Sequence, residues 1–253
     1  MKSGTDKFWN ERAGKMKSGV AVNLLDTCQR EMEFDYISRY LDKTQRVLEV
    51  GCGNGYSTSV FREQVKWVDA MDYSAEMVTR AKNETGETNN RFFEDSILEP
   101  RHIQPPYDIV ICVRVLINLR NLDQQRAAVD SMASALESSG KLLLVEGFAD
   151  GFEKLSELRA KVGMPPLTPN KINFYSRMSD LLSHAGKLFS IEGSFHLGSF
   201  DYLTRVVYPH LAGPDKVEHN SPMAARLTEL ARVFNSDGLE EYSRLRGFLL
   251  VRR

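Results

Sequence analysis

Three glycines interrupt the apolar run VLEVGCGNGYS at residues 47–57. An apolar strand that breaks into such a turn before a helix is typical of nucleotide-binding α/β domains, because glycine lets the backbone turn tightly beneath a ligand. The dinucleotide fingerprint G-x-G-x-x-G would need a glycine at position 56, which Tyr56 occupies. Glu49, two residues before the first glycine, would repel a pyrophosphate but suits a ligand with an ammonium group. The turn therefore indicates a ligand other than a dinucleotide.

Short apolar runs alternate with amphipathic stretches along the chain, which predicts a parallel sheet covered by helices on both faces. The predicted strands are residues 45–50, 65–72, 91–95, 107–113, 141–148, 188–197 and 244–253. The predicted helices between them are residues 57–64, 74–84, 123–139 and 176–186, with Gly140 and Gly186 as helix ends. We expect a doubly wound, Rossmann-like sheet of seven strands, mostly parallel, whose last strand is antiparallel.

The chain is expected to form a single domain over residues 1–253, with two helical additions. Residues 1–42 are predicted to form an N-terminal helical cap, because apolar side chains recur there near helical spacing. Residues 198–243 are predicted to form a helical insertion before the last strand. Insertions of this length in α/β domains are usually lids or walls, so we expect this one to be a substrate wall.

Composition and charge argue against several kinds of partner. The formal net charge of −1 disfavours a nucleic-acid substrate. Residues 1–15 lack the apolar core of a signal peptide, and no window approaches about 18 consecutive apolar residues. The three cysteines form no CxxC pair and are interpreted as reduced thiols. We therefore expect a cytoplasmic monomer or homodimer with a small-molecule substrate, no membrane partner and no metal site.

Two further acids stand at the ends of predicted strands. Asp72 ends the second strand, 23 residues after Glu49. An acid about 20 residues beyond such a turn typically accepts hydrogen bonds from ribose hydroxyls. The alternative is that Asp72 caps the next helix, although Ser74 suits that position better. Asp95 follows the third strand, and the alternative for it is a solvated loop acid.

Four segments, in this order, resemble the successive motifs of class I S-adenosylmethionine-dependent methyltransferases: EVGCGNG at residues 49–55, AMDYSAEMVTRAK at 70–82, FFEDSI at 92–97 and YDIVICVRVLINL at 107–119. The resemblance covers roughly residues 45–148, and LLSHAGKLFSIEG extends it toward residue 193. It implies that S-adenosylmethionine is the cofactor. The cofactor-binding residues that it implies are Glu49, Gly51, Cys52, Gly53, Asp72, Tyr73, Met77, Asp95, Ser96, Ile97, Val113 and Arg114.

The same resemblance implies a role for each part of this set. The glycine turn would pass beneath the methionine part of the cofactor, with Glu49 at its ammonium group and Asp72 on the ribose diol. Tyr73 and Met77 would flank the adenine, although a methionine at helical spacing is as often a core residue.

The adenine amino group would be bound by Asp95, with Ser96 and Ile97 alongside. Val113 and Arg114 would lie near the methyl-donating sulfur. Cys52 is interpreted as a small buried side chain rather than a nucleophile, because no basic residue follows it closely.

The acceptor side of the site is less constrained by the sequence. The predicted substrate-binding residues are Trp9, Asn118, Tyr202 and Arg205. His196 and His210 are the candidate general bases, since the unperturbed histidine pKa lies near neutrality, and His219 is a further possibility. A lone histidine is more often structural, and FDYLTRVVYPHL at residues 200–211 equally fits an ordinary amphipathic helix.

The predicted function is methyl transfer from S-adenosylmethionine to a small molecule, at oxygen rather than nitrogen. An RNA or protein methyltransferase and a non-catalytic S-adenosylmethionine-binding module are the alternatives. A nicotinamide oxidoreductase is disfavoured by Tyr56.

Overall fold

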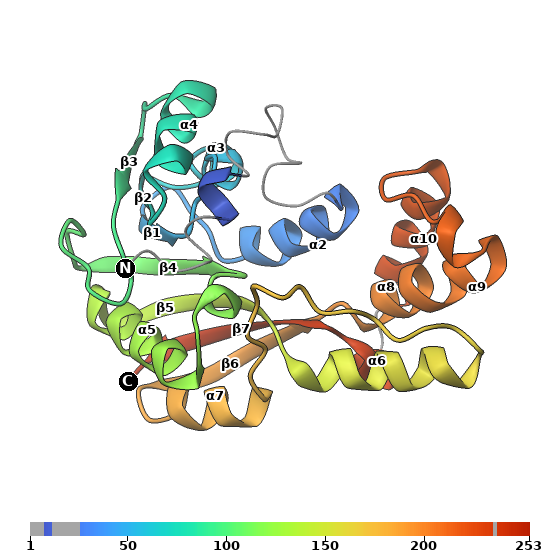
Figure 1. The fold of residues 1–253 in the computed structure, drawn as a ribbon. Coiled ribbons are helices and arrows are strands. Elements are labelled where there is room, and N and C mark those ends of the chain that lie inside the picture. The colour runs from blue at the N-terminus through green and yellow to red at the C-terminus, as the bar shows by residue number, and fades with distance from the viewer. Residues whose placement is uncertain (1–7, 12–25, 235–236) are drawn as a thin grey trace.

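The computed structural model describes residues 8–11, 26–234 and 237–253, which build one mixed sheet of order β3-β2-β1-β4-β5-β7-β6 (Figure 1). The strands are β1 (Arg46–Val50), β2 (Trp67–Asp72), β3 (Asn90–Glu94), β4 (Tyr107–Val113), β5 (Leu136–Gly147), β6 (Phe189–His196) and β7 (Leu245–Arg252). Strands β1 to β5 pair in parallel, and β7 is antiparallel to both of its neighbours, β5 and β6. The predicted seven-stranded sheet with an antiparallel last strand is confirmed.

Helices connect the strands and cover the sheet. They are α2 (Thr27–Ser38), α3 (Tyr56–Phe61), α4 (Ala75–Thr85), η2 (Leu116–Asn118), α5 (Leu122–Ala135), α6 (Ala149–Lys161) and α7 (Met178–Ala185). Several begin at a residue whose side chain accepts a backbone N–H of the first turn. Ser74 accepts from Met77 at the start of α4, and Asn121 accepts from Gln124 at the start of α5.

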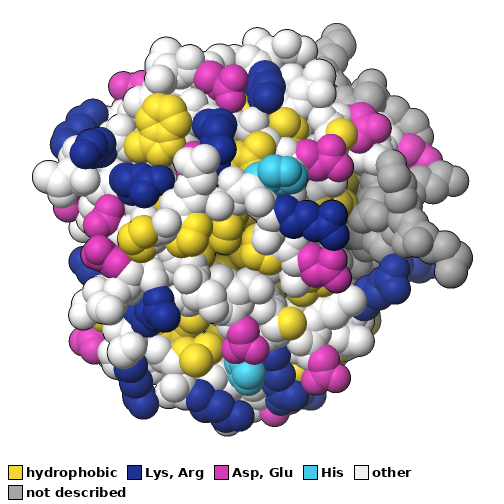
Figure 2. All heavy atoms as spheres, turned by 90° about the vertical axis from the view of Figure 1, so that its left-hand side faces the viewer, with side chains coloured by type: hydrophobic (Ala, Val, Ile, Leu, Met, Phe, Trp, Pro, Cys, Tyr) yellow, Lys and Arg dark blue, Asp and Glu magenta, His cyan; other side chains and the backbone are white. Residues whose placement is uncertain are grey.

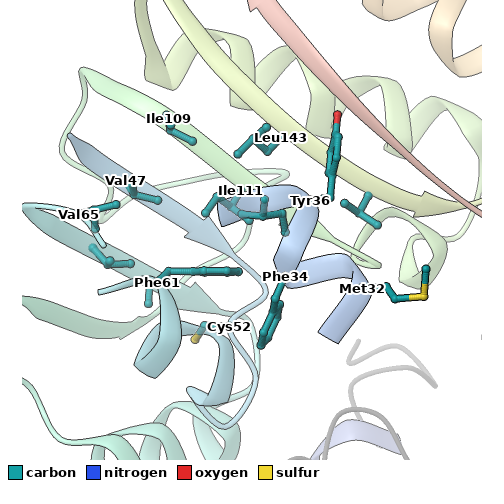
Figure 3. Close-up of a cluster of buried hydrophobic side chains, with 14 of the residues drawn as sticks. Met32, Phe34, Tyr36, Val47, Cys52, Phe61, Val65, Ile109, Ile111 and Leu143 are labelled. Atoms are coloured by element: carbon teal, nitrogen blue, oxygen red, sulfur yellow. The ribbon is translucent and has the colours of Figure 1, made fainter. Parts of the chain in front are cut away.

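Two apolar layers pack on opposite faces of the sheet. Helices α2, α3 and α4 contribute buried side chains to one layer, which Figure 3 shows with Phe34 of α2 near Phe61 of α3, and with strand residues such as Ile109 and Ile111 in the same cluster. Helices α5 and α7 contribute to the other layer, against strand residues such as Val110. Strands β1, β2 and β4 are buried along nearly their whole length, as the near-continuous apolar runs predict.

The end predicted for the helix after β4 is wrong. Helix α5 ends at Ala135, and Leu136 already has the extended backbone of β5, where it pairs with Tyr107. Gly140 therefore lies within a strand and caps no helix. Burial explains the difference, because Leu136 is only 2% exposed and packs in the sheet core. Gly186 does end α7, as predicted.

The segment between β6 and β7 is helical, as expected for residues 198–243. It contains α8 (Gly198–Tyr202), the π-helical η3 (Leu203–Val207), α9 (Tyr208–Ala212), η4 (Pro214–Lys216), α10 (Pro222–Val233) and η5 (Asp237–Tyr242). Figure 1 places α8, α9 and α10 at one end of the sheet, beyond the start of α2 and close to α6. Within the predicted N-terminal cap the structure describes α2 and a helical stretch at residues 8–11, and residues 1–7 and 12–25 lie outside the described part. No helix in the described ranges is long and apolar enough to cross a membrane.

Candidate functional site

A cavity of about 420 Å³ opens at the carboxyl ends of the parallel strands. Gly51 follows β1, Asp72 ends β2, Arg114 follows β4 and Gly147 ends β5, and all four line it. The cavity is bounded on its other side by the stretch at residues 8–11, by α2 and by the segment between β6 and β7. Ligands of open α/β sheets bind at this edge, so the cavity is the candidate site.

The glycine turn beneath the cavity needs its glycines. Gly51, Gly53 and Gly55 have φ angles of 74°, 56° and 80°, in the left-handed region that side chains disfavour. A Cβ atom on Gly51 would also lie 2.4 Å from a methyl group of Val115. Because these positions carry no side chains, the backbone of the turn can lie close to a ligand in the cavity.

Glu49 is buried at the floor of the cavity and is 4% exposed. The hydroxyl of Thr58 donates to one carboxylate oxygen at 2.5 Å, and Ser57 donates to the other. Burial raises the pKa of Glu49 above its ordinary value, while these two hydroxyls and Arg30 act in the opposite direction. A positively charged group of a ligand in the cavity would stabilise the ionised form of this buried carboxylate.

Asp72 holds two turns together at the end of β2. One carboxylate oxygen accepts the backbone N–H of Gly53 and the other accepts that of Ser74, each at 2.9 Å. Burial raises the pKa of Asp72 to about 6. Because Ser74 caps α4, Asp72 is not that helix's cap. Its carboxylate lines the cavity instead.

The predicted adenine-side residues divide into two groups. Tyr73 and Met77 line the cavity. Asp95 is outside the lining, and its carboxylate accepts backbone N–H groups of Ser96, Arg101 and His102 at 2.7–3.1 Å. Asp95 therefore organises the loop after β3.

Three further predicted cofactor residues have different placements. Ile97 packs in the second apolar layer, whereas Val113 lines the cavity. Cys52 is fully buried outside the lining, and burial raises the pKa of its thiol well above the ordinary value. All three cysteines of the chain are free.

The exit of β4 is fixed by an acid that sequence reasoning missed. Glu146, 1% exposed at the end of β5, accepts the backbone N–H groups of Leu116 at 2.7 Å and Ile117 at 3.3 Å. Burial raises the pKa of Glu146 to about 7. The sequence signal that could have indicated this acid is Glu146, which with Gly147 ends an apolar predicted strand. The carboxylate holds η2 against β5 and so positions Arg114 and Asn118 at the cavity.

Two predicted substrate residues meet at this exit. The Trp9 indole donates to the amide oxygen of Asn118 at 3.1 Å. The Asn118 amide nitrogen donates to the carbonyl of Arg114 at 2.9 Å. Trp9, Asn118 and Arg114 all line the cavity. The structure thus brings residues of the N-terminal stretch and the β4 exit to one wall.

Further lining residues come from segments in which sequence analysis found no motif. The rings of Tyr175 and Phe152 pack against each other at a centroid distance of 4.8 Å, with an angle of 51° between their planes, and both line the cavity. Gly147 makes room for this pair, since a Cβ atom there would lie 2.9 Å from the Tyr175 ring. Arg244 extends over the Phe152 ring at 5.6 Å and is anchored by Asp201 at 2.7 Å.

Of the residues predicted between β6 and β7, Arg205 lines the cavity together with His219. Tyr202 does not line it and packs against the small apolar cluster of α6 and η3 instead. His210 is exposed, and the imidazole of His196 accepts the N–H of Gly198 at 3.2 Å. His219 is therefore the histidine that reaches the cavity among the described residues.

An ionic contact joins α2 to the helical segment across the cavity. Asp26 caps the start of α2, is 5% exposed, and accepts from Arg205 at 2.5 Å, while His219 lies 3.4 Å away. Both the backbone N–H and the hydroxyl of Thr27 donate to the Asn220 side chain, at 2.8 and 2.7 Å. Although burial would raise the pKa of Asp26, His219 and Arg205 hold it well below its ordinary value.

The sheet order and the cavity at the strand ends define a Rossmann-like α/β protein with a cofactor-sized site. The family model for the methyltransferase domain matches residues 24–186, and this chain belongs to that family.

Two curated relatives are similar to part of the chain. The ubiquinone biosynthesis O-methyltransferase of Xylella fastidiosa is 28% identical over 156 residues, covering 56% of this chain and 58% of that protein. The ubiquinone/menaquinone biosynthesis C-methyltransferase of Methylococcus capsulatus is 27% identical over 113 residues, covering 40% and 43%. The chain thus spans about half the length of the curated relatives it matches.

Among solved structures, the N-methyltransferase of Bradyrhizobium japonicum in complex with S-adenosyl-L-homocysteine aligns with a TM-score of 0.60. It is 13% identical, and 99% of each chain is covered. That likeness shows the fold. The names of these three proteins assign their methyl groups to oxygen, carbon and nitrogen, so the acceptor atom does not follow from similarity.

Proposed function

We propose that this protein transfers the methyl group of S-adenosylmethionine to a small-molecule acceptor, at oxygen rather than nitrogen. The observation that carries the proposal is the pair of buried carboxylates, Glu49 and Asp72, on either side of the glycine turn at the cavity floor. One carboxylate suits the ammonium group of the cofactor and the other suits its ribose diol.

The cavity lining supports the other proposed cofactor contacts. Tyr73 and Met77 would pack along the adenine, since both side chains reach the cavity beside Asp72. Asp95, with Ser96 and Ile97, would shape the adenine end through the loop that its carboxylate orders. When bound, S-adenosylmethionine supplies an activated methyl group on a sulfonium. The protein's task is then mainly to align the acceptor with it.

A small acceptor is supported by the way the cavity is covered. Trp9 and Asn118, the aromatic pair Phe152 and Tyr175, and the Asp26–Arg205 contact all line it. The formal net charge of −1 does not favour a nucleic-acid substrate. On the face shown in Figure 2, Lys and Arg side chains are interspersed with Asp and Glu side chains.

Calorimetry tests the cofactor directly. We expect S-adenosylmethionine and S-adenosylhomocysteine to bind with Kd values in the low micromolar range, about −8 kcal/mol, and NAD not to bind. An acceptor panel of phenols, catechols, carboxylic acids and primary amines, followed by S-adenosylhomocysteine release, then tests turnover. Tight binding of NAD without binding of S-adenosylmethionine would contradict the proposal. Cofactor binding without turnover of any acceptor would favour a non-catalytic binding module.

For transfer to oxygen, a base must remove the hydroxyl proton, and we propose His219 for this role in place of His196 and His210. Replacing His219 with Ala should lower turnover of a hydroxyl acceptor about 100-fold, because general-base catalysis contributes about 10²–10⁴. Affinity for S-adenosylhomocysteine should stay the same. His210→Ala is the matched control, since His210 is an exposed histidine of the same segment. Equal turnover in the His219→Ala variant and the control would exclude His219 as the base.

A further inference from the structure

Tyr175 lies on a segment that is hydrogen-bonded to the exits of two neighbouring strands. The backbone N–H of Phe174 donates to the carbonyl of Ile117, in η2 after β4, at 2.7 Å. The backbone N–H of Ala149, at the start of α6 after β5, donates to the carbonyl of Ser176 at 3.1 Å. Because these two bonds flank Tyr175 in the chain, its backbone is held in place at the carboxyl ends of β4 and β5.

The Tyr175 ring occupies the β5 end of the cavity. It packs so closely on Gly147 that a Cβ atom there would lie 2.9 Å from the ring, and the Phe152 ring of α6 contacts it from another direction. The carboxylates proposed to bind the cofactor belong to β1 and β2. In the sheet order β4 separates β1 from β5, so Tyr175 lies beyond these cofactor contacts, on the side of the cavity left for the acceptor.

The hydroxyl group of Tyr175 has a proton to donate. Its oxygen accepts the side-chain amide of Asn173 at 2.9 Å, and within the described ranges no group accepts its O–H. Burial raises the pKa of Tyr175 above its ordinary value of 10.0, while Asn173 and Arg244 act in the opposite direction. The phenol therefore keeps its proton at neutral pH and is a hydrogen-bond donor rather than a base. Since Tyr175 lines the cavity, a ligand there can accept that hydrogen bond.

We propose that Tyr175 binds the methyl acceptor and selects one that carries a hydrogen-bond-accepting oxygen, a hydroxyl or a carbonyl, on a flat apolar body. This inference rests on the proposed function. The phenol donates to that oxygen, and the rings of Tyr175 and Phe152 contact the apolar body. A donor on a fixed segment also orients the acceptor, because its direction does not change on binding.

The bound oxygen is distinct from the oxygen that is methylated. A hydrogen bond donated to the attacking oxygen would stabilise its lone pairs before the transfer and would oppose attack on the methyl group. Tyr175 therefore binds a second oxygen of the same molecule. The acceptor class is a small aromatic compound with two oxygen substituents, one methylated and one held by Tyr175.

Matched pairs of phenols test this in the wild-type protein saturated with S-adenosylhomocysteine. Catechol, resorcinol and hydroquinone are each compared with the methylphenol that has a methyl group in place of one hydroxyl. The three hydroxybenzaldehydes are compared with the corresponding vinylphenols. Ligand-observed NMR titration gives the Kd values. At least one oxygen-bearing probe should bind about tenfold or more tightly than its partner, because the partner leaves a buried donor unpaired. If none does, the proposal is overturned.

Substitution then assigns the preference to the Tyr175 hydroxyl. Tyr175→Phe keeps the ring on Gly147 and should lose the preference, while its affinity for S-adenosylhomocysteine stays the same. Tyr202→Phe is the matched control, since Tyr202 packs outside the cavity lining, and it should keep the full preference. An unchanged preference in Tyr175→Phe overturns the proposal.

A second variant gives the same readout without altering the tyrosine. Asn173→Asp places a carboxylate beside the hydroxyl, where it would accept the phenolic proton, so the preference should fall here as well. A preference that survives in both Tyr175→Phe and Asn173→Asp means that Tyr175 only supports the segment between α6 and α7. Failure of the proposed function has a different signature, namely no binding of S-adenosylhomocysteine to the wild type.

Discussion

Replacing Asp72 with Ala should weaken binding of S-adenosylhomocysteine by about 100-fold or more. In the proposed binding mode the carboxylate accepts two hydrogen bonds from the ribose, and each such bond to a charged group is worth about 1.5–3 kcal/mol. The substitution also removes the acceptors for the N–H groups of Gly53 and Ser74, so the glycine turn loses its anchor. Calorimetry measures the affinity, and urea unfolding of the apo protein measures the free energy of unfolding.

We expect the apo Asp72→Ala protein to be destabilised by about 1–3 kcal/mol as well, because two N–H groups lose their acceptors. Asp123→Ala on α5 is the control, since Asp123 is an exposed acid with no contact to the cavity. Asp72→Asn keeps one acceptor oxygen and should fall between the wild type and Asp72→Ala. Unchanged affinity in Asp72→Ala would mean that Asp72 only braces the two turns.

Replacing Arg205 with Ala should destabilise the protein by about 3–5 kcal/mol, the usual cost of removing one partner of a buried ion pair. Asp26 is 5% exposed, and the Arg205 side chain is 13% exposed. The substitution leaves the buried Asp26 carboxylate with His219 and the Gln29 N–H but without its guanidinium partner. Urea unfolding at neutral pH measures the loss.

The pH dependence of the stability difference tests whether the ion pair is its cause. The folded-state pKa of Asp26 lies below its ordinary value of 3.8, so the pair's stabilisation is present above pH 3.8 and is lost as the pH falls below it. The stability difference between wild type and Arg205→Ala should therefore shrink in acid. Asp26→Asn combined with Arg205→Met should recover much of the loss, since it removes both charges. A constant difference from pH 7 to pH 3 would show that lost packing of Arg205, for example on Phe200, dominates.

The cofactor half of the fold was predictable because its signals are local. The glycines at 51, 53 and 55 have left-handed φ angles, Glu49 lies one residue before the end of β1 and Asp72 ends the neighbouring β2, so short motifs fix both the backbone and the carboxylates. The end of α5 was predicted wrongly because Leu136 is buried in the sheet core. Helical spacing in the sequence does not indicate that burial.

The acceptor half was only partly predictable because its contacts join distant segments. Arg30 and Tyr175 carry no motif, and their position at the cavity depends on how α2 and the residues before α7 pack. Tyr202 and Arg205 stand in one short helical run, yet only Arg205 reaches the cavity. Sequence spacing alone does not decide which side of such a run faces inward when the run is π-helical.

The position of β7 in the sheet has a consequence for synthesis on the ribosome. Strand β7 lies between β5 and β6, and β6 pairs with β7 and with no other described strand. A nascent chain that has not yet produced residues 245–252 exposes one side of β5, with its apolar run at residues 142–145, as an unpaired edge. Such edges promote aggregation during translation. Chaperone demand should therefore fall once β7 is available for pairing, and a chain truncated before residue 245 should be a better chaperone client than one that contains β7.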